Sequence, residues 1–120
     1  MPQYLLLIYG DPADAPPPEE QEAQMAKWYE YTQALGESGA MLGGNALEPA
    51  DTATTVRVRD DETLITDGPF AETKEILGGY YLIDVADLDA ALAWAAKMPN
   101  IRHGSVEVRP IWEIPEAPPQ

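Results

Sequence analysis

The sequence predicts an α+β fold, a ferredoxin-like sandwich with two helices on one face of an antiparallel sheet. Two short segments are apolar at consecutive positions, which is typical of strands covered on both faces. Two other segments carry apolar residues at helical spacing. The order along the chain is strand, helix, strands, strand, helix, strand. This is the order of a βαββαβ unit with an extra hairpin in its middle.

The first strand and the first helix are predicted from the N-terminal third of the chain. Tyr4 to Tyr9 is a continuous apolar run that ends at a Gly-Asp-Pro turn. Pro18 then stands at a first helical position, followed by glutamates, which the positive end of the helix dipole favours. Gly39 is the predicted stop of this helix. The stripe expected to face the core consists of Met25, Trp28, Tyr29, Thr32 and Leu35.

An edge strand and a hairpin are predicted in the middle of the chain. Met41 to Leu47 is interrupted by glycines, which indicates a weak strand at the edge of the sheet. Thr54 to Arg59 alternates valines on one face with arginines on the other. The turn signal Asp60-Asp61 lets Thr63 to Thr66 return as its partner strand. Gly68-Pro69 then breaks the chain, with Gly68 expected at positive φ.

The C-terminal half supplies another central strand, a helix and a last strand. Gly79 to Val85 is apolar on both faces, and Asp87 is the expected N-cap of the second helix. Ser105 to Glu113 alternates and is predicted as one strand, with Val106, Val108 and Trp112 on its apolar face. The buried stripe of the second helix is predicted to be Leu88, Ala91, Leu92, Ala95 and Met98.

The apolar strands also predict a homodimer. The first and third core strands lie at the centre of the sheet in this topology, and these are the two strands that are apolar on both faces. The two helices can cover only one face, so Leu5, Leu7 and Tyr80, or the set opposite them, need another cover. In a chain of 120 residues we expect that cover to be a second copy.

Length and composition restrict the organisation of the chain. The 120 residues suit one domain, which we place at residues 1–114, followed by a Pro-rich tail at residues 115–120. The apolar run near the N-terminus is too short to span a membrane, and it has no basic leader or small-residue cleavage site. Together with the absence of cysteine, these features predict a cytoplasmic protein.

Charge and residue usage exclude several classes of function. The net charge of −14 opposes binding to nucleic acids and to anionic membranes, so neither is expected as a partner. The chain has no Cys and one His, which excludes thiolate nucleophiles, Cys-based zinc sites and metal centres with several His. No phosphate-binding glycine motif is present. We therefore expect neither a metal nor a cofactor.

The most specific motif is the segment Asp67-Gly68-Pro69-Phe70-Ala71-Glu72-Thr73-Lys74-Glu75, followed by Gly78-Gly79-Tyr80-Tyr81. With it, the chain closely resembles the DGPF branch of the YCII-related domain family. The likeness extends over roughly residues 3 to 113 and includes Tyr4 to Gly10, Thr54 to Arg57 and His103 to Pro110. The resemblance implies a ferredoxin-like fold that dimerises through its sheet, as in dimeric α+β barrels.

The resemblance supports two interpretations of function. The wider family includes a dehydrochlorinase that acts on a chlorinated hydroxyquinone, for which a His–Asp pair is proposed as the acid/base centre. This implies a small organic ligand and cofactor-free acid/base chemistry of the lyase or elimination type. Members of the DGPF branch are also often encoded beside extracytoplasmic-function sigma factors, which implies a non-catalytic accessory or regulatory protein. A cavity around His103 would favour the first interpretation, and a convex surface there would favour the second.

His103 and Asp67 are the candidate catalytic residues. His103 is the only side chain whose ordinary pKa lies near neutrality, which suits a proton shuttle, although a His at a strand edge can also simply bond to the backbone. Asp67 can orient an imidazole or act as a base, but an Asp before Gly-Pro also closes Asx turns. We expect the loop from Asp67 to Glu75 to approach His103 and form one wall of a pocket.

The candidate ligand-binding residues are Phe70, Glu72, Lys74 and Arg109. Phe70, the only Phe, can line a pocket or fill the core. Glu72 and Lys74 belong to a charged loop, which is also what an ordinary solvated surface looks like. Arg109 can hold an anionic ligand or pair with a carboxylate on a neighbouring strand. Arg57 and Arg59 are expected to pair with carboxylates.

Overall fold

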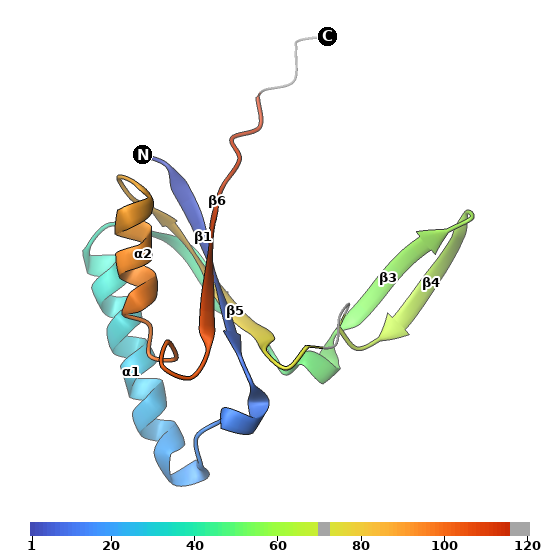
Figure 1. Ribbon diagram of the computed structural model, residues 1–120, viewed down its shortest axis with the longest axis horizontal. Coiled ribbons are helices and arrows are strands. Elements are labelled where there is room, and N and C mark those ends of the chain that lie inside the picture. Colours follow the sequence, from blue (N-terminus) through green and yellow to red (C-terminus); the bar gives the residue numbers. More distant parts are fainter. Residues whose placement is uncertain (70–72, 116–120) are drawn as a thin grey trace.

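A computed structural model describes residues 1–69 and 73–115 of the chain (Figure 1). Four antiparallel strands form the main sheet in the order β2–β5–β1–β6, and two helices lie against one face of it. A separate hairpin, β3–β4, completes the predicted ferredoxin-like topology with an extra hairpin. The elements are β1 (Gln3–Gly10), α1 (Pro18–Glu37), β2 (Met41–Ala46), β3 (Thr54–Arg59), β4 (Glu62–Asp67), β5 (Ile76–Asp84), α2 (Leu88–Ala96) and β6 (Ser105–Pro110), with 3₁₀ turns at Pro12–Asp14 and Ala50–Thr52.

The core lies between the helices and the sheet. The central strands β1 and β5 pair so that Tyr4 lies opposite Ile83 and Leu6 opposite Tyr81, and all four side chains are buried. Leu35 of α1 completes this core. The alternate positions of the same strands, among them Leu5 and its neighbours, are only half-buried on the other face. The sheet thus has one face covered by helices and one open face, as the sequence predicts.

The predicted starts of both helices and the predicted stop of α1 are confirmed, whereas α2 ends at Ala96, before the predicted stripe residue Met98. Helix α1 begins at Pro18, and Gly39 adopts a φ of 81°, a left-handed conformation that glycine reaches without strain. Helix α2 is capped by Asp87, whose carboxylate accepts a hydrogen bond from the Ala90 amide at 2.9 Å. Neither of the described helices is long and apolar enough to cross a lipid bilayer.

The helices face the core with partly different residues from those predicted. In α1 the buried side chains are Tyr31 and Leu35, whereas Met25 and Tyr29 are more than half exposed. Tyr31 turns inward because its ring has aromatic neighbours and its hydroxyl finds a carbonyl on α2. In α2 the small Ala91 and Ala95 face the core, with Met98 just after the helix, so the predicted Leu88 and Leu92 point outward and are nearly half-exposed.

Strands β5 and β6 differ from the prediction by three residues at one end, whereas the other strands agree with it to within one residue at each end. Strand β5 begins at Ile76, three positions before the predicted start, because Ile76 and Leu77 continue the pairing with Gly10 and Tyr9 of β1. Strand β6 ends at Pro110, which pairs with Tyr4 close to the start of β1. The sheet offers no further partner strand there, and the predicted strand residue Trp112 is exposed.

The β3–β4 hairpin, residues 54–67, stands away from the rest of the molecule, and we call it the arm (Figure 1). Its two-residue turn is Asp60-Asp61, both at positive φ (51° and 64°), a geometry that Asp tolerates better than most residues. The radius of gyration is 17.2 Å. A compact chain of this length would have a value near ~14 Å. The arm accounts for the elongated shape.

Candidate functional site

His103 lies in a cavity of about 400 Å³ at the end of the sheet where β1 stops and β6 starts. The walls come from the segment that follows β1, the first half of α1 and the loop before β6. The lining side chains that bear on its chemistry are Asp11, Asp14, Glu20, Trp28, Asn100 and His103. With Gln24, which also lines it, the cavity combines one imidazole, three carboxyl groups, two amides and an aromatic ring.

The backbone around His103 is tied to the end of β1. The amides of His103 and Gly104 both donate to the Asn100 carbonyl, at 3.0 and 2.7 Å. The Asn100 side chain in turn donates to the Tyr9 carbonyl at 3.2 Å. A Cβ on Gly104 would collide with that same Tyr9 carbonyl, so the close approach of the two segments requires glycine. These contacts fix the position from which the imidazole projects.

The imidazole of His103 is exposed and makes no hydrogen bond or ion pair with the residues that the structure describes. The His103 side chain is therefore not bonded to a backbone group, which was the non-catalytic role considered for it in the sequence analysis. A free imidazole in a cavity can accept or donate a proton without first breaking an internal bond. The geometry agrees with the proton-shuttle interpretation, whose chemistry itself stays a prediction.

Asp11 is the carboxyl group most firmly held at the cavity. Its Oδ1 accepts from the Ala13 amide at 2.9 Å, and its Oδ2 lies 4.0 Å from Lys74 Nζ. The side chain is only 14% exposed, whereas Lys74 is 87% exposed, so the ion pair is a weak surface contact. Asp11 thus presents a fixed negative charge at one wall of the cavity.

Among the described residues of the loop predicted to approach His103, those at its C-terminal end lie beside the segments that form the cavity. Lys74 contacts Asp11, as described above. Glu75 accepts a hydrogen bond at 3.0–3.1 Å from the Oγ of Ser105, a residue two positions after His103. Asp67, by contrast, ends β4 opposite Thr54 and does not line the cavity. Gly68 has the predicted positive φ, 98°. Phe70 and Glu72 lie outside the described residues.

Arg109 lies elsewhere, on the open face of the sheet. It pairs with Leu5 in the register of β6 and β1, and its Nε lies 3.7 Å from Glu107 Oε2 in an exposed ion pair. Arg59 donates to the Val58 carbonyl at 2.9 Å. The arginine expected to hold an anionic ligand is therefore not part of the His103 cavity within one chain.

The carboxylates of the cavity were missed by sequence reasoning. Asp11, Asp14 and Glu20 belong to a Pro-rich stretch that looks like an ordinary surface loop. The topology carries a usable signal, because β1 and β6 are antiparallel neighbours. The residues that follow β1 must then lie beside those that precede β6. Asp11 comes directly after β1 and His103 shortly before β6, so the predicted fold already places them together.

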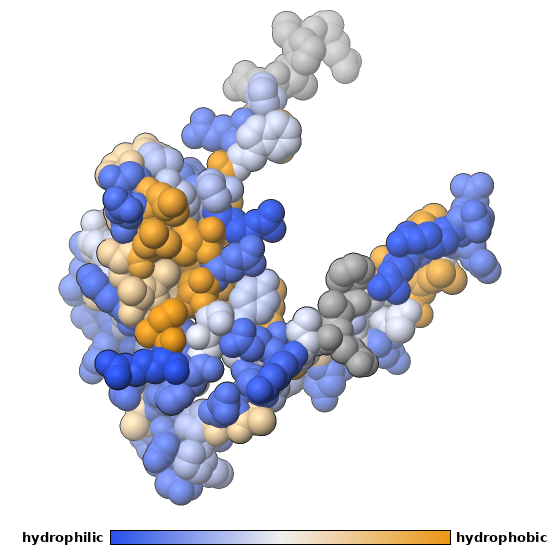
Figure 2. Space-filling view, viewed as in Figure 1, coloured by the Kyte–Doolittle hydropathy of each residue, from blue (hydrophilic) through white to orange (hydrophobic). Residues whose placement is uncertain are grey.

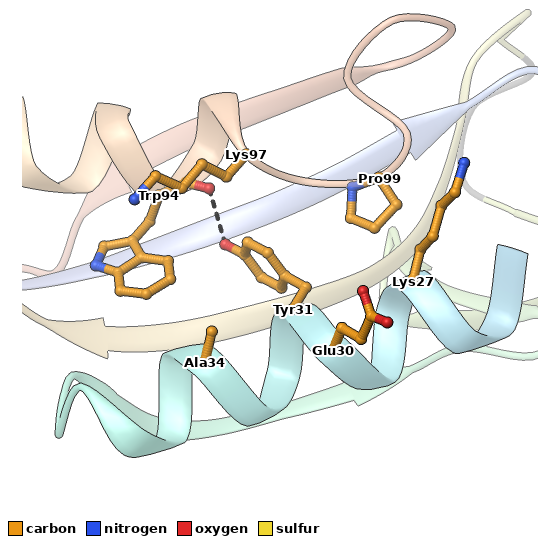
Figure 3. A pocket seen from close by; sticks show the side chains of 7 residues that line it. All are labelled: Lys27, Glu30, Tyr31, Ala34, Trp94, Lys97 and Pro99. Carbon is orange, nitrogen blue, oxygen red and sulfur yellow. Dashed lines mark hydrogen bonds between the residues drawn. The ribbon is translucent and has the colours of Figure 1, made fainter.

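A second cavity, of about 390 Å³, lies between the two helices (Figure 3). Tyr31 and Trp94 form its floor, with Lys27 and Lys97 at its edges, and the Tyr31 hydroxyl donates to the Trp94 carbonyl at 2.9 Å. Burial, and then the nearby Tyr81, raise the pKa of Tyr31 well above its ordinary value. No residue predicted from sequence lines this cavity, and no imidazole does, so it is the weaker candidate for acid/base chemistry.

Comparison with known proteins settles the family. The model of the YCII-related domain matches residues 2–115. The chain belongs to the YCII-related domain family. An uncharacterised protein of Rhizobium meliloti (strain 1021) is 41% identical to this YCII-related protein over 112 residues, which are 90% of each chain. The match to the family as a whole confirms the predicted resemblance, while membership of the DGPF branch stays a prediction.

A solved structure shares the fold of this YCII-related protein. It is the 5-chloro-2-hydroxyhydroquinone dehydrochlorinase of Burkholderia phenoliruptrix AC1100, in complex with 2,5-dihydroxybenzoquinone. The two chains superpose with a TM-score of 0.51 over 92% of this chain and 93% of the other, at 12% sequence identity. At that identity the likeness concerns the fold alone. Among the described residues, no group of three His, Asp or Glu side chains is arranged to hold a metal ion.

Proposed function

We propose that this YCII-related protein binds a small organic ligand in the cavity of His103 and transfers a proton there without a cofactor. The reaction class is a lyase or elimination reaction. The observation that carries the proposal is the position of His103, the only His of the chain, which lines a cavity together with carboxyl groups and a tryptophan and makes no side-chain hydrogen bond with the described residues. The cavity offers a small molecule both hydrogen-bonding groups and the apolar face of Trp28.

His103 would act as the base in such a reaction. Its neutral imidazole takes a proton from the carbon adjacent to the carbon that bears the leaving group, the C–H electron pair becomes the new double bond between these two carbons, and the leaving group departs with its own electron pair. Asp11, Asp14 and Glu20 line the same cavity as His103. In this scheme the carboxyl partner of His103 is one of these residues, with Asp11 the best held.

The charge of the cavity narrows the class of ligand. Three carboxyl groups and a chain of net charge −14 disfavour a ligand with several negative charges. The Trp28 ring offers an apolar surface at one wall of the cavity. This suits a neutral aromatic compound with hydroxyl groups, since its ring can pack on Trp28.

The regulatory alternative predicts a different surface. An accessory protein of a sigma factor needs no cavity at His103, and a convex surface there would have favoured it. His103 instead lies in a cavity with polar side chains, which favours a ligand-binding role. We also infer a homodimer formed through the open sheet face, because Leu5, Leu7 and Leu82 remain only half-buried there in a single chain.

The test of the proposed function uses the single imidazole as a reporter. NMR signals of the His103 ring are followed while hydroquinone, which is neutral at pH 7, and 2,5-dihydroxybenzoquinone, which is anionic, are added separately. We expect a saturable shift with hydroquinone and weaker binding of the anion. Asp14→Asn and Asp11→Asn should narrow the difference between the two compounds. Asp67→Asn, which alters a carboxylate on the arm, is the matched control and should not change either affinity.

Two outcomes would overturn the proposal. If neither compound nor a library of neutral hydroxylated aromatics produces a saturable shift, the cavity is not a ligand site, and the accessory role becomes the better interpretation. If binding is seen but His103→Gln leaves the affinity and the bound pose unchanged, the imidazole is not part of the site. Turnover would be sought by mass spectrometry of the bound compounds after incubation with the parent and with His103→Gln.

A further inference from the structure

The arm carries an apolar strip that nothing covers in the described residues of one chain. Val56, Val58 and Ile65 are 62%, 57% and 68% exposed. Val56 lies opposite Ile65 in the register of β3 and β4, and Val58 is two positions from Val56, so the three side chains share one face of the hairpin. A two-stranded hairpin is marginally stable in water by itself. An arm with such a strip is therefore expected to pack against another surface.

The open face of the main sheet is a second uncovered apolar surface. Leu5 lies opposite Leu82 and Leu7 opposite Tyr80, all on the face away from the helices, and each is half-buried. Charged residues surround them, with Glu107 beside Leu7. An apolar centre with a polar rim is the usual composition of a protein interface.

Both surfaces are on the same side of the molecule. In Figure 1 the helices lie on one side of the main sheet, and the arm leaves on the other side. Figure 2 shows the arm separated from the body, with apolar surface along it. A body placed against the open sheet face would therefore also lie within reach of the arm.

A second copy of the chain is the occupant that fits both surfaces at once. With two-fold symmetry, each copy offers its open face to the other open face and its arm to the other body, so these two apolar surfaces are both covered. The arm, residues 54–67, carries two arginines and four carboxyl groups, a net charge of −2. Apolar contact and not charge must therefore hold it against the acidic second copy.

We propose that the arm crosses to a second copy of this chain and packs its strip of Val56, Val58 and Ile65 against that copy, beside the contact between the two sheets. The inference rests on the homodimer proposed above and adds that the arm is the element that holds the two copies together. The dimer then contains two exchanged arms, and the extended shape of the single chain is the shape of one half of that assembly.

Charge placed on the strip tests the role of the arm. Ile65→Asp buries a carboxylate in the proposed contact without changing the body of the protein. We expect sedimentation equilibrium to give a dimer dissociation constant raised by at least about tenfold. Leu92→Asp, which puts the same charge on the outer face of α2, is the matched control and should change the constant less than about twofold. Circular dichroism confirms that both variants are folded.

Cross-linking tests the crossing itself. The chain has no cysteine, so Val58→Cys introduces one unique site on the strip, which is labelled with benzophenone maleimide. A mixture of unlabelled and ¹⁵N-labelled chains is irradiated, and cross-linked peptides are identified by mass spectrometry. We expect covalent dimers whose peptides join the arm of one isotope to the body of the other. Leu92→Cys, treated in the same way, should give few covalent dimers.

The possible results separate this inference from the homodimer. A dimer that is unaffected by Ile65→Asp, with cross-links only within one chain, overturns the arm exchange and leaves the homodimer through the sheet intact. A parent protein that is monomeric at tens of micromolar overturns both. A dimer that Ile65→Asp and Leu92→Asp weaken equally shows a general effect of added charge and also counts against the arm.

Discussion

Gly104 shows how a single residue determines the position of the candidate catalytic group. A Cβ at this position would collide with the Tyr9 carbonyl and lie 3.0 Å from the Asn100 amide nitrogen. The absence of a side chain therefore lets the His103 loop lie directly on the end of β1. Because the contact is with backbone, the structure cannot adapt by rotating a side chain.

Gly104→Ala should lower the free energy of unfolding by about 1–3 kcal/mol, the usual cost of forcing extra volume into a packed contact. It should also weaken hydroquinone binding, because the backbone beneath His103 must move. Gly36→Ala is the matched control: it lies in α1 with nothing within 4 Å of the added Cβ. That substitution should raise the free energy of unfolding by roughly 0.5–1 kcal/mol. Urea denaturation measures the free energy of unfolding of both variants. Equal changes for Gly104→Ala and Gly36→Ala would contradict the proposed close contact at Gly104.

The sequence identifies the imidazole of the site but not its carboxyl partners. His103 is the only His of the chain, so it can be selected as the candidate proton shuttle from the sequence alone. Asp67 was chosen from its motif, yet within one chain it ends a strand of the arm and does not line the cavity. Asp11 carries no motif of its own, and its place beside His103 depends on which strands are neighbours. The residue types predict which chemistry a site can perform, whereas the residues that lie close together are determined by the order of the strands in the sheet.

At the scale of elements, strand order and helix limits follow from the sequence better than helix rotation does. Pro18, Gly39 and Asp87 act locally, through a fixed φ, a positive φ and a capping bond, and all three predictions are confirmed. The buried faces of the helices depend on the partner surface. Tyr31 is buried because Trp94 and Tyr81 receive it, a condition that periodicity within one helix cannot detect.

The bond between α1 and α2 should make stability depend on pH. The pKa of Tyr31 is raised above its usual 10.0 by burial, so the unfolded chain loses this proton at a lower pH than the folded chain. The stabilising effect is complete below pH 10 and decreases as the pH rises above 10. We expect the free energy of unfolding to fall there by up to about 1.4 kcal/mol per pH unit from this residue.

Tyr31→Phe tests this prediction, because it removes the titrating hydroxyl and the bond to the Trp94 carbonyl. At pH 7 the variant should be less stable by about 1 kcal/mol. Between pH 9.5 and pH 11 its stability should decrease less steeply than that of the parent. Tyr29→Phe, at an exposed position of the same helix, should keep the parental slope. Identical slopes for parent and Tyr31→Phe in urea denaturation would refute the assignment.

At the scale of the whole molecule, the sequence predicts the fold and the existence of the hairpin but not the direction of the arm. Alternation of valines and the Asp60-Asp61 turn are local signals, and they suffice for β3 and β4 to pair. Where the hairpin points depends on the segments that join it to β2 and β5, which have no repeating pattern. The half-buried residues of the open sheet face do follow from the sequence, since two helices cover only one face.

The charge of the chain gives a last prediction for the assembled molecule. Each copy carries a net charge of −14, so two copies repel each other, and the apolar surfaces of arm and sheet must outweigh this repulsion. Raising the salt concentration from 0.1 to 1 M shortens the screening length from about 10 to about 3 Å. We therefore expect the dimer dissociation constant, measured by sedimentation equilibrium, to decrease several-fold. Leu92→Asp adds one more charge per copy away from the proposed contact and should make this decrease steeper. A dissociation constant that rises with salt would mean that ion pairs of the arm arginines, not apolar packing, hold the two copies together.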